Sequence, residues 1–199
     1  MNSKSKTKES LIEENQTLQK RVAKLEKLLS TQKQIETELR NLTLCDDLTN
    51  LYNRRGFFTL AEQQFKIAKR MKRRILLIYA DIDNLKQIND TYGHDAGGSV
   101  IVDSSNILKL CLRDSDIISR FGGDEFVIFP LGISQESTKV IIDRMQEKFD
   151  AHNKKVNRNY KISISFGIKE YDPQSPCSLE ELIRQADELM YEQKKRKKS

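Results

Sequence analysis

RFGGDEFVIF, residues 120–129, places two glycines and two adjacent carboxylates between apolar segments. The flanking segments, DIISRF (116–121) and EFVIFPL (125–131), are short and rich in β-branched and aromatic residues. They therefore predict two antiparallel strands joined by a tight turn. The turn has two interpretations. Asp124 and Glu125 could simply be polar residues at its tip, or glycine could leave room there for a phosphate while the carboxylates hold its metal ion.

A second carboxylate pair ends the preceding strand. RRILLIYADID, residues 73–83, is apolar almost throughout, which predicts a central strand of a sheet. Asp81 and Asp83 at its end could cap the following helix. Alternatively, Asp81 and Asp124 could lie on neighbouring strand ends and bind Mg²⁺, which prefers oxygen ligands. Two such ions would bracket the attacking and leaving oxygens of a phosphoryl or nucleotidyl transfer.

Helical and strand patterns alternate through the rest of this region. We expect a helix around Phe57–Ala68, a short helix at 85–90, a loop at 91–98 (TYGHDAGG), helices at 99–112, 135–149 and 178–195, and a strand at 160–171. Strands and helices interleave without an internal repeat. The pattern is typical of an α+β fold, in which a central sheet that contains antiparallel strands is flanked by helices.

The N-terminal segment has a different character, because residues 10–44 contain no glycine or proline. Leucines recur every seven residues at Leu11, Leu18 and Leu25, and Asn15, Val22 and Leu29 fill the alternate seam position. This heptad predicts a parallel coiled-coil dimer, although a lone amphipathic helix is the alternative. A shifted heptad follows, through Leu25, Leu28, Ile35, Leu39 and Leu42. We therefore expect a dimerisation helix over residues 1–44 and a globular domain over 45–199.

Composition excludes several classes of protein. The net charge is +6, but removing the five cations at 194–198 lowers it to +1, so we expect a solvated C-terminal run and no nucleic-acid partner. No run of 18 apolar residues and no secretory signal is present, which predicts no membrane partner. Cys45, Cys111 and Cys177 are odd in number and far apart, as expected in a reducing cytoplasm. We therefore predict a cytoplasmic location.

Four linked motifs together resemble a known family. DDLTNLYNRRGF (46–57), ADIDNLKQINDTYGHDAGG (80–98), RFGGDEF (120–126) and ADELMYEQK (186–194) follow the order and spacing of the GGDEF domain, the diguanylate cyclase family. The resemblance covers residues 46 to about 195. It implies a palm-like sheet similar to that of nucleotide cyclases, and condensation of two GTP molecules into cyclic di-GMP with loss of two pyrophosphates. Each subunit of a dimer would hold one GTP.

The resemblance also implies roles for individual residues. Asp81, Asp124 and the Ile82 carbonyl resemble the Mg²⁺ ligands, with two ions per active site and Mn²⁺ as an alternative. Glu125 resembles a carboxylate tied to catalysis, and either Asp124 or Glu125 could accept the proton of the 3′-hydroxyl. The substrate contacts implied are the glycines Gly122 and Gly123 at the hairpin, the cations Lys86 and Lys194 at the triphosphate, and the nucleotide-contacting Asn89 and His94.

The sequence departs from the family pattern at two places. The family usually reads G-H-x-x-G-D, and its Asp recognises the guanine edge, whereas GHDAGG puts Gly98 there. Loss of a charged acceptor would cost about 1–3 kcal/mol of base selectivity. The alternatives are strict GTP use, with water or Asn89 sufficing, or relaxed purine use that yields mixed cyclic AMP-GMP. At the C-terminus, Lys197 and Lys198 replace the family's glycine and arginine.

A separate site is implied by RDSD, residues 113–116. Such a pair is common at helix ends as surface charge, but here it stands at the family's distance before the glycines. Arg113 and Asp116 resemble the inhibitory site that grips product cyclic di-GMP, and Arg144 resembles its secondary arginine. This suggests product inhibition, or a non-catalytic cyclic di-GMP receptor. The intact residues Gly122 to Glu125 favour the enzyme over the receptor.

Overall fold

The computed structural model describes residues 8–132, 135–156 and 158–198, and the chain divides into two units, Met1–Thr43 and Leu44–Ser199. No helix in the described ranges combines the length and the apolarity needed to cross a membrane. The elements in chain order are α1 (Lys8–Leu42), β1 (Tyr52–Asn53), α2 (Arg54–Arg70), β2 (Ile75–Ile82), α3 (Leu85–Tyr92), α4 (His94–Cys111), β3 (Ile117–Arg120), β4 (Glu125–Phe129), α5 (Gln135–Lys155), β5 (Ile164–Tyr171) and α6 (Leu179–Lys198).

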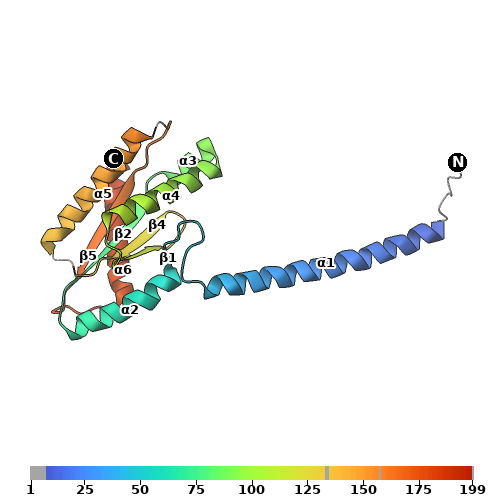
Figure 1. Ribbon diagram of the computed structural model, residues 1–199, viewed down its shortest axis with the longest axis horizontal. Coiled ribbons are helices and arrows are strands. Elements are labelled where there is room, and N and C mark those ends of the chain that lie inside the picture. The colour runs from blue at the N-terminus through green and yellow to red at the C-terminus, as the bar shows by residue number, and fades with distance from the viewer. Residues whose placement is uncertain (1–7, 133–134, 157, 199) are drawn as a thin grey trace. The chain divides into compact units, whose positions relative to one another are not determined.

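The first unit is the single helix α1 of 35 residues, which confirms the expected continuous helix (Figure 1). The leucines of its predicted seam are exposed on this chain, with Leu18 at 55% and Leu25 at 54%. The predicted seam positions Leu39 and Leu42 lie outside the residues whose side chains are described. An apolar seam on a long helix requires a covering partner, and the pairing of two such helices stays a prediction.

The second unit is built on a five-stranded mixed sheet in the order β1-β3-β4-β2-β5. β3 and β4 form the predicted antiparallel hairpin, and β2 pairs antiparallel with both β4 and β5. Every residue of β2 is buried, which confirms that the apolar segment forms an interior strand. β1 pairs in parallel with β3, and the other strand pairs of the described residues are antiparallel.

Helices cover both faces of this sheet, since alternate residues of each strand point to opposite sides. Ile78 and Phe126 belong to a core cluster that also holds apolar residues of α4 and α5, and α4 and α5 lie together on one side of the sheet in Figure 1. Leu77 and Val127 belong to the other cluster, with apolar residues of α2 and α6. The layers are therefore helix, sheet and helix, as the α+β prediction requires.

The prediction of a loop at 91–98 was wrong. α3 continues through Tyr92, α4 begins at His94, and Gly93 alone separates them with a φ of 87°. A glycine in this conformation ends one helix and lets the next begin without a loop. The small and polar residues around Gly93 suggested a loop instead, which is why the prediction failed. β1 was not predicted, because two residues carry no periodicity.

Candidate active site at the ends of β2 and β4

The sheet register brings the two predicted carboxylate pairs to one place. Asp81 at the end of β2 lies opposite Glu125 at the start of β4. The Ile82 amide donates to the Asp124 carbonyl at 3.0 Å, which fixes the hairpin turn against the end of β2. Two strand ends in antiparallel register therefore place Asp81, Ile82 and Asp124 together, as the sequence predicted.

The two hairpin glycines have different roles. A methyl group on Gly122 would overlap the carboxylate of Glu125, which folds back over the turn. A methyl group on Gly123 would meet nothing within 4 Å. A side chain at position 122 would therefore displace the Glu125 carboxylate, whereas Gly123 leaves open space at the tip.

Glu125 and Asp124 face different surroundings. Glu125 lies on the same side of the sheet as Tyr79, where burial and the neighbouring Glu125 raise the pKa of the Tyr79 phenol. Asp124 borders an open cavity of about 370 Å³ between α3 and the end of α6. Lys86 and Lys194 border the same cavity, so both cations predicted to face a triphosphate lie beside this carboxylate.

Asp81 is 7% exposed and pairs with the Lys194 ammonium of α6. Burial is the largest influence on this carboxyl group and raises its pKa to about 6. The hydrogen bond from Lys194 acts in the opposite direction, but the negative charges of Asp124 and Glu125 add to the increase. The charge of Asp81 is therefore only partly compensated by the protein.

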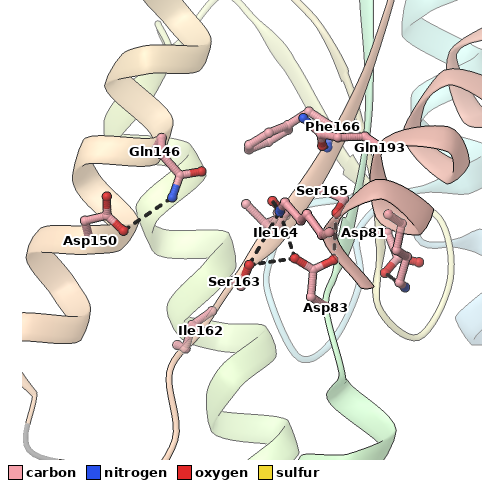
Figure 2. Close-up of polar contacts among 12 residues, drawn as sticks. Asp81, Asp83, Gln146, Asp150, Ile162, Ser163, Ile164, Ser165, Phe166 and Gln193 are labelled. Atoms are coloured by element: carbon pink, nitrogen blue, oxygen red, sulfur yellow. Dashed lines mark hydrogen bonds and ion pairs between the residues drawn. The ribbon is translucent and has the colours of Figure 1, made fainter. Parts of the chain in front are cut away.

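Asp83 is equally buried but is held by several donors (Figure 2). The hydroxyls of Ser163 and Ser165 donate to its two oxygens at 2.6 and 2.7 Å, and the Lys197 ammonium lies 2.9 Å from Oδ2. Burial would raise the pKa of Asp83, but these hydrogen bonds together lower it. The interpretation of Asp81 and Asp83 as helix caps was wrong, because Asn84 occupies the N-cap of α3 and their carboxylates bond elsewhere.

The positions predicted to contact the nucleotide, Asn89, His94 and Gly98, lie around the break between α3 and α4. The Asn89 side chain packs so closely on Gly97 that a methyl group there would overlap its amide. A methyl group on Gly98 would meet nothing within 4 Å, so the position of the missing carboxylate is open. His94 is exposed and begins α4. The structure therefore places Asn89 against the first turn of α4, close in sequence to His94 and Gly98.

The sequence did not predict an ion pair that links the β3–β4 hairpin to the start of the domain. Arg120 donates to the Gly123 carbonyl at 2.9 and 3.3 Å and pairs with Asp46 at 3.1 Å. Asp46 also accepts from the amide and hydroxyl of Thr49. Burial would raise the pKa of Asp46, but the bonds from Thr49 and Arg120 outweigh it and lower the pKa. Arg120 is half-buried, and the signal available in the sequence was an arginine at the end of an apolar strand segment, next to the hairpin turn.

Arg113, Asp116 and Arg144 border one hollow of about 300 Å³ at the other end of the β3–β4 hairpin. Asp116 is 7% exposed, and its two oxygens accept from the amides of Arg113 and Leu131, each at 2.9 Å. Arg144 donates to the Cys111 carbonyl. The structure therefore places the three predicted residues around one hollow. Asp116 also links the backbone before β3 to the backbone after β4.

Comparisons with known proteins agree with this architecture. The family model described as "Diguanylate cyclase, GGDEF domain" matches residues 43–199. The chain is 35% identical over 157 residues to the probable diguanylate cyclase DgcC of Escherichia coli strain K12, covering 79% of this chain and 42% of that protein. It is 31% identical over 154 residues to diguanylate cyclase DgcP of the same strain, covering 76% and 45%.

A solved structure shares the fold of the second unit. The GGDEF domain of DgcB from Caulobacter crescentus, in complex with c-di-GMP, superposes with a TM-score of 0.67 at 26% identity, covering 77% of this chain and 91% of that one. The chain spans less than half the length of the two curated relatives above.

Proposed function

Because the chain belongs to the GGDEF domain family of diguanylate cyclases, we propose that it condenses two molecules of GTP into cyclic di-GMP and releases two pyrophosphates. The observation that carries the proposal is the arrangement at the ends of β2 and β4. There, Lys86, Lys194 and Asp124 border one open cavity, and the partly compensated carboxylate of Asp81 is bonded to Lys194. This edge of the sheet therefore holds both the lysines suited to bind a triphosphate and the carboxylates suited to bind its metal ion.

The donors at this edge fit a divalent metal ion. Asp81, the Ile82 carbonyl and Asp124 would hold it, and Mg²⁺ suits such oxygen ligands, with Mn²⁺ as a substitute. Burial, together with the negative charges of Asp124 and Glu125, raises the pKa of Asp81, and a bound dication would offset both effects. In the described part of the chain, no three acidic, histidine or cysteine side chains converge as a metal site, so substrate phosphates would complete the coordination of the two expected ions. When bound, the metal supplies charge neutralisation at the reacting phosphate.

Substrate binding and proton transfer are assigned to individual side chains of the site. Lys86 and Lys194 orient the triphosphate, and Lys194 exchanges the Asp81 carboxylate for phosphate oxygens when substrate enters. Asp124 borders the cavity, whereas Glu125 lies beside Tyr79 and over Gly122. Asp124 is therefore the better placed of the two acids to accept the proton of the 3′-hydroxyl as its oxygen attacks the α-phosphate and pyrophosphate leaves.

Condensation of two GTP molecules needs two active sites that face each other. We propose that a homodimer formed through α1 brings these two sites together. The exposed seam leucines repeat every seven residues, and a parallel pair of such helices covers them. A tether of this kind raises the effective concentration of one site at the other to about the millimolar range. Deletion of residues 1–44 is expected to lower the specific activity strongly at nanomolar protein; unchanged activity at every protein concentration would contradict the role of α1.

The function is tested with the purified full chain, GTP and Mg²⁺. We expect a product with the mass of cyclic di-GMP and two pyrophosphates released for each product molecule. Asp81→Asn should stop both, whereas Asp150→Asn is the matched control, because Asp150 is exposed on α5 and accepts a hydrogen bond from Gln146 of the same helix, far in sequence from the strand ends. A folded chain that binds GTP but releases no pyrophosphate would favour a receptor over an enzyme.

Relaxed purine use is the second candidate, because the open position at Gly98 carries no acceptor for the guanine edge. An assay with GTP, ATP and their mixture separates the candidates. Mixed cyclic AMP-GMP would support relaxed use, and Gly98→Asp should then shift the products toward cyclic di-GMP by about tenfold or more. Cyclic di-GMP alone from the mixture would remove this candidate.

We also assign product inhibition to the hollow bordered by Arg113, Asp116 and Arg144. The two guanidinium groups suit the acceptor edge of guanine, and the Asp116 carboxylate suits its donors. Arg113→Ala should relieve inhibition by added cyclic di-GMP while leaving initial rates unchanged. Equal inhibition of the parent chain and the variant would contradict this assignment.

A further inference from the structure

The end of α6 is attached to the sheet at points that the triphosphate site does not explain. The Lys197 ammonium donates to the Ile164 carbonyl at 2.6 Å and to Asp83 at 2.9 Å. One turn earlier, the Gln193 side chain accepts the Phe166 amide at 2.6 Å. Both contacts fall on β5, which is an edge strand, so α6 satisfies backbone groups that have no neighbouring strand.

The partner of Lys197 is itself rigid. The Asp83 side chain is 8% exposed and is fixed by hydroxyls from Ser163 and Ser165 (Figure 2). Lys197, whose side chain is 37% exposed, therefore reaches from the surface into a prearranged acceptor site. The sequence places lysine here where the family pattern has glycine, and α6 continues through this position to Lys198.

A second attachment lies in the middle of the helix. A methyl group on Gly167 would overlap the Ala186 carbonyl and the Met190 amide, so the backbone of α6 rests directly on β5. Lys194 lies between this contact and Lys197. Because residues three apart share one face of a helix, Lys194 and Lys197 both point toward the end of β2, where they meet Asp81 and Asp83.

We propose that Lys197 is a positioning residue, which holds the last turn of α6 on Asp83 and β5 so that Lys194 is presented to the triphosphate of the substrate. The last turn of a helix ordinarily frays, and Lys194 lies next to that turn. Restraining Lys197 lowers the conformational entropy that Lys194 loses when it binds phosphate. The inference deepens the proposed function and rests on it for the identity of the substrate.

The test uses 3′-deoxy-GTP, which lacks the attacking hydroxyl and so reports binding without turnover. Lys197→Ala is expected to raise its Kd about tenfold, and Lys194→Ala to raise it at least as much. In the Lys194→Ala background, Lys197→Ala should change the Kd by less than about twofold, because Lys197 acts only through Lys194. Lys197→Arg, which retains a donor, should stay within about threefold of the parent chain.

Arg196→Ala is the matched control, since Arg196 is 83% exposed and its recorded ion pair is with Glu192 on the same helix. Thermal unfolding of each variant checks the fold, and Lys197→Met, which keeps the aliphatic stem, replaces Lys197→Ala if the latter unfolds. Equal affinities of the parent chain and Lys197→Ala (or Lys197→Met where it replaces Lys197→Ala), or additive effects with Lys194→Ala, would overturn the inference. A parent chain that binds no 3′-deoxy-GTP would instead contradict the proposed function.

Discussion

Asp81 and Asp83 lie two residues apart at the end of one strand and are equally buried, yet their surroundings shift their pKa values in opposite directions. Asp81 has one ammonium partner and two acidic neighbours, and its pKa rises to about 6, whereas two hydroxyls and an ammonium lower the pKa of Asp83. Burial alone therefore does not determine the role of a carboxylate. The donors that surround it matter as much, and we propose on this basis that Asp81 takes a metal ion while Asp83 organises the structure.

The strongest test of this difference is metal affinity. With 3′-deoxy-GTP bound, Asp81→Asn should weaken Mn²⁺ binding about 10³-fold, because a charged ligand is lost at a site with few others. Asp83→Asn should weaken it by no more than about tenfold, through the looser end of α6. Titration of Mn²⁺ followed by electron paramagnetic resonance measures both values. Similar losses in the two variants would remove the distinction.

The second prediction concerns stability. Asp83→Ala should lower the free energy of unfolding by about 3 kcal/mol, because the buried hydroxyl of Ser165 and the half-buried hydroxyl of Ser163 lose their acceptor and Lys197 loses its ion pair. Urea denaturation without metal or nucleotide measures this value, with the exposed Asp150→Ala as control. A loss below about 1 kcal/mol would show that Asp83 does not organise this end of the sheet.

A third change acts on both carboxylates by moving the helix that supplies their cations. Gly167→Ala should destabilise the fold by about 2 kcal/mol, because the added methyl group forces α6 away from β5. Gly123→Ala is the matched control for stability, since its methyl group meets nothing within 4 Å. If both glycine variants unfold at the same urea concentration as the parent chain, the close contact of α6 with β5 is not needed.

The smallest expected effect is a difference in pH dependence. The folded-state pKa of Asp81, about 6, lies above its ordinary value of 3.8, so the folded state binds the proton more tightly than the unfolded state. Lowering the pH from 7.5 to 5 should therefore stabilise the metal-free parent chain relative to Asp81→Asn by about 1 kcal/mol. The contribution of Asp83, whose pKa is lowered, is constant over this range and is lost only in stronger acid. Urea titrations at the two pH values, with a chelator present, measure the change; the opposite sign would contradict the environment described for Asp81.

The sequence predicted the hairpin, the interior strand and the cations at the cavity, because each follows from local periodicity or from the linked motifs. It could not predict the partners of Asp83, since Ser163, Ser165 and Lys197 lie about 80 or more residues away and meet it only after β5 and α6 pack on β2. Lys197 was visible only as a departure from the family's glycine. Its contact with Asp83 arises because α6 continues past the position where glycine would end it.

The local sequence pattern also gave a wrong prediction at a position where the conformation of one residue determines the structure. At Gly93 a single positive φ joins two helices, and a run of small and polar residues around it imitates a loop. The pair formed by Arg120 and Asp46 was similarly hidden, because it joins segments 74 residues apart. The first feature depends on the conformation of one glycine and the second on a tertiary contact, and neither is visible as periodicity.

The central claim is that Asp81 serves the chemistry and Asp83 the scaffold, and one assay tests it most directly. The rate of pyrophosphate release from GTP and Mg²⁺ is measured for Asp81→Asn and Asp83→Asn, each divided by the fraction of chain that is folded. We predict a fall of about 10³-fold for Asp81→Asn and of no more than about tenfold for Asp83→Asn. Equal falls, or a larger one for Asp83→Asn, would contradict the account.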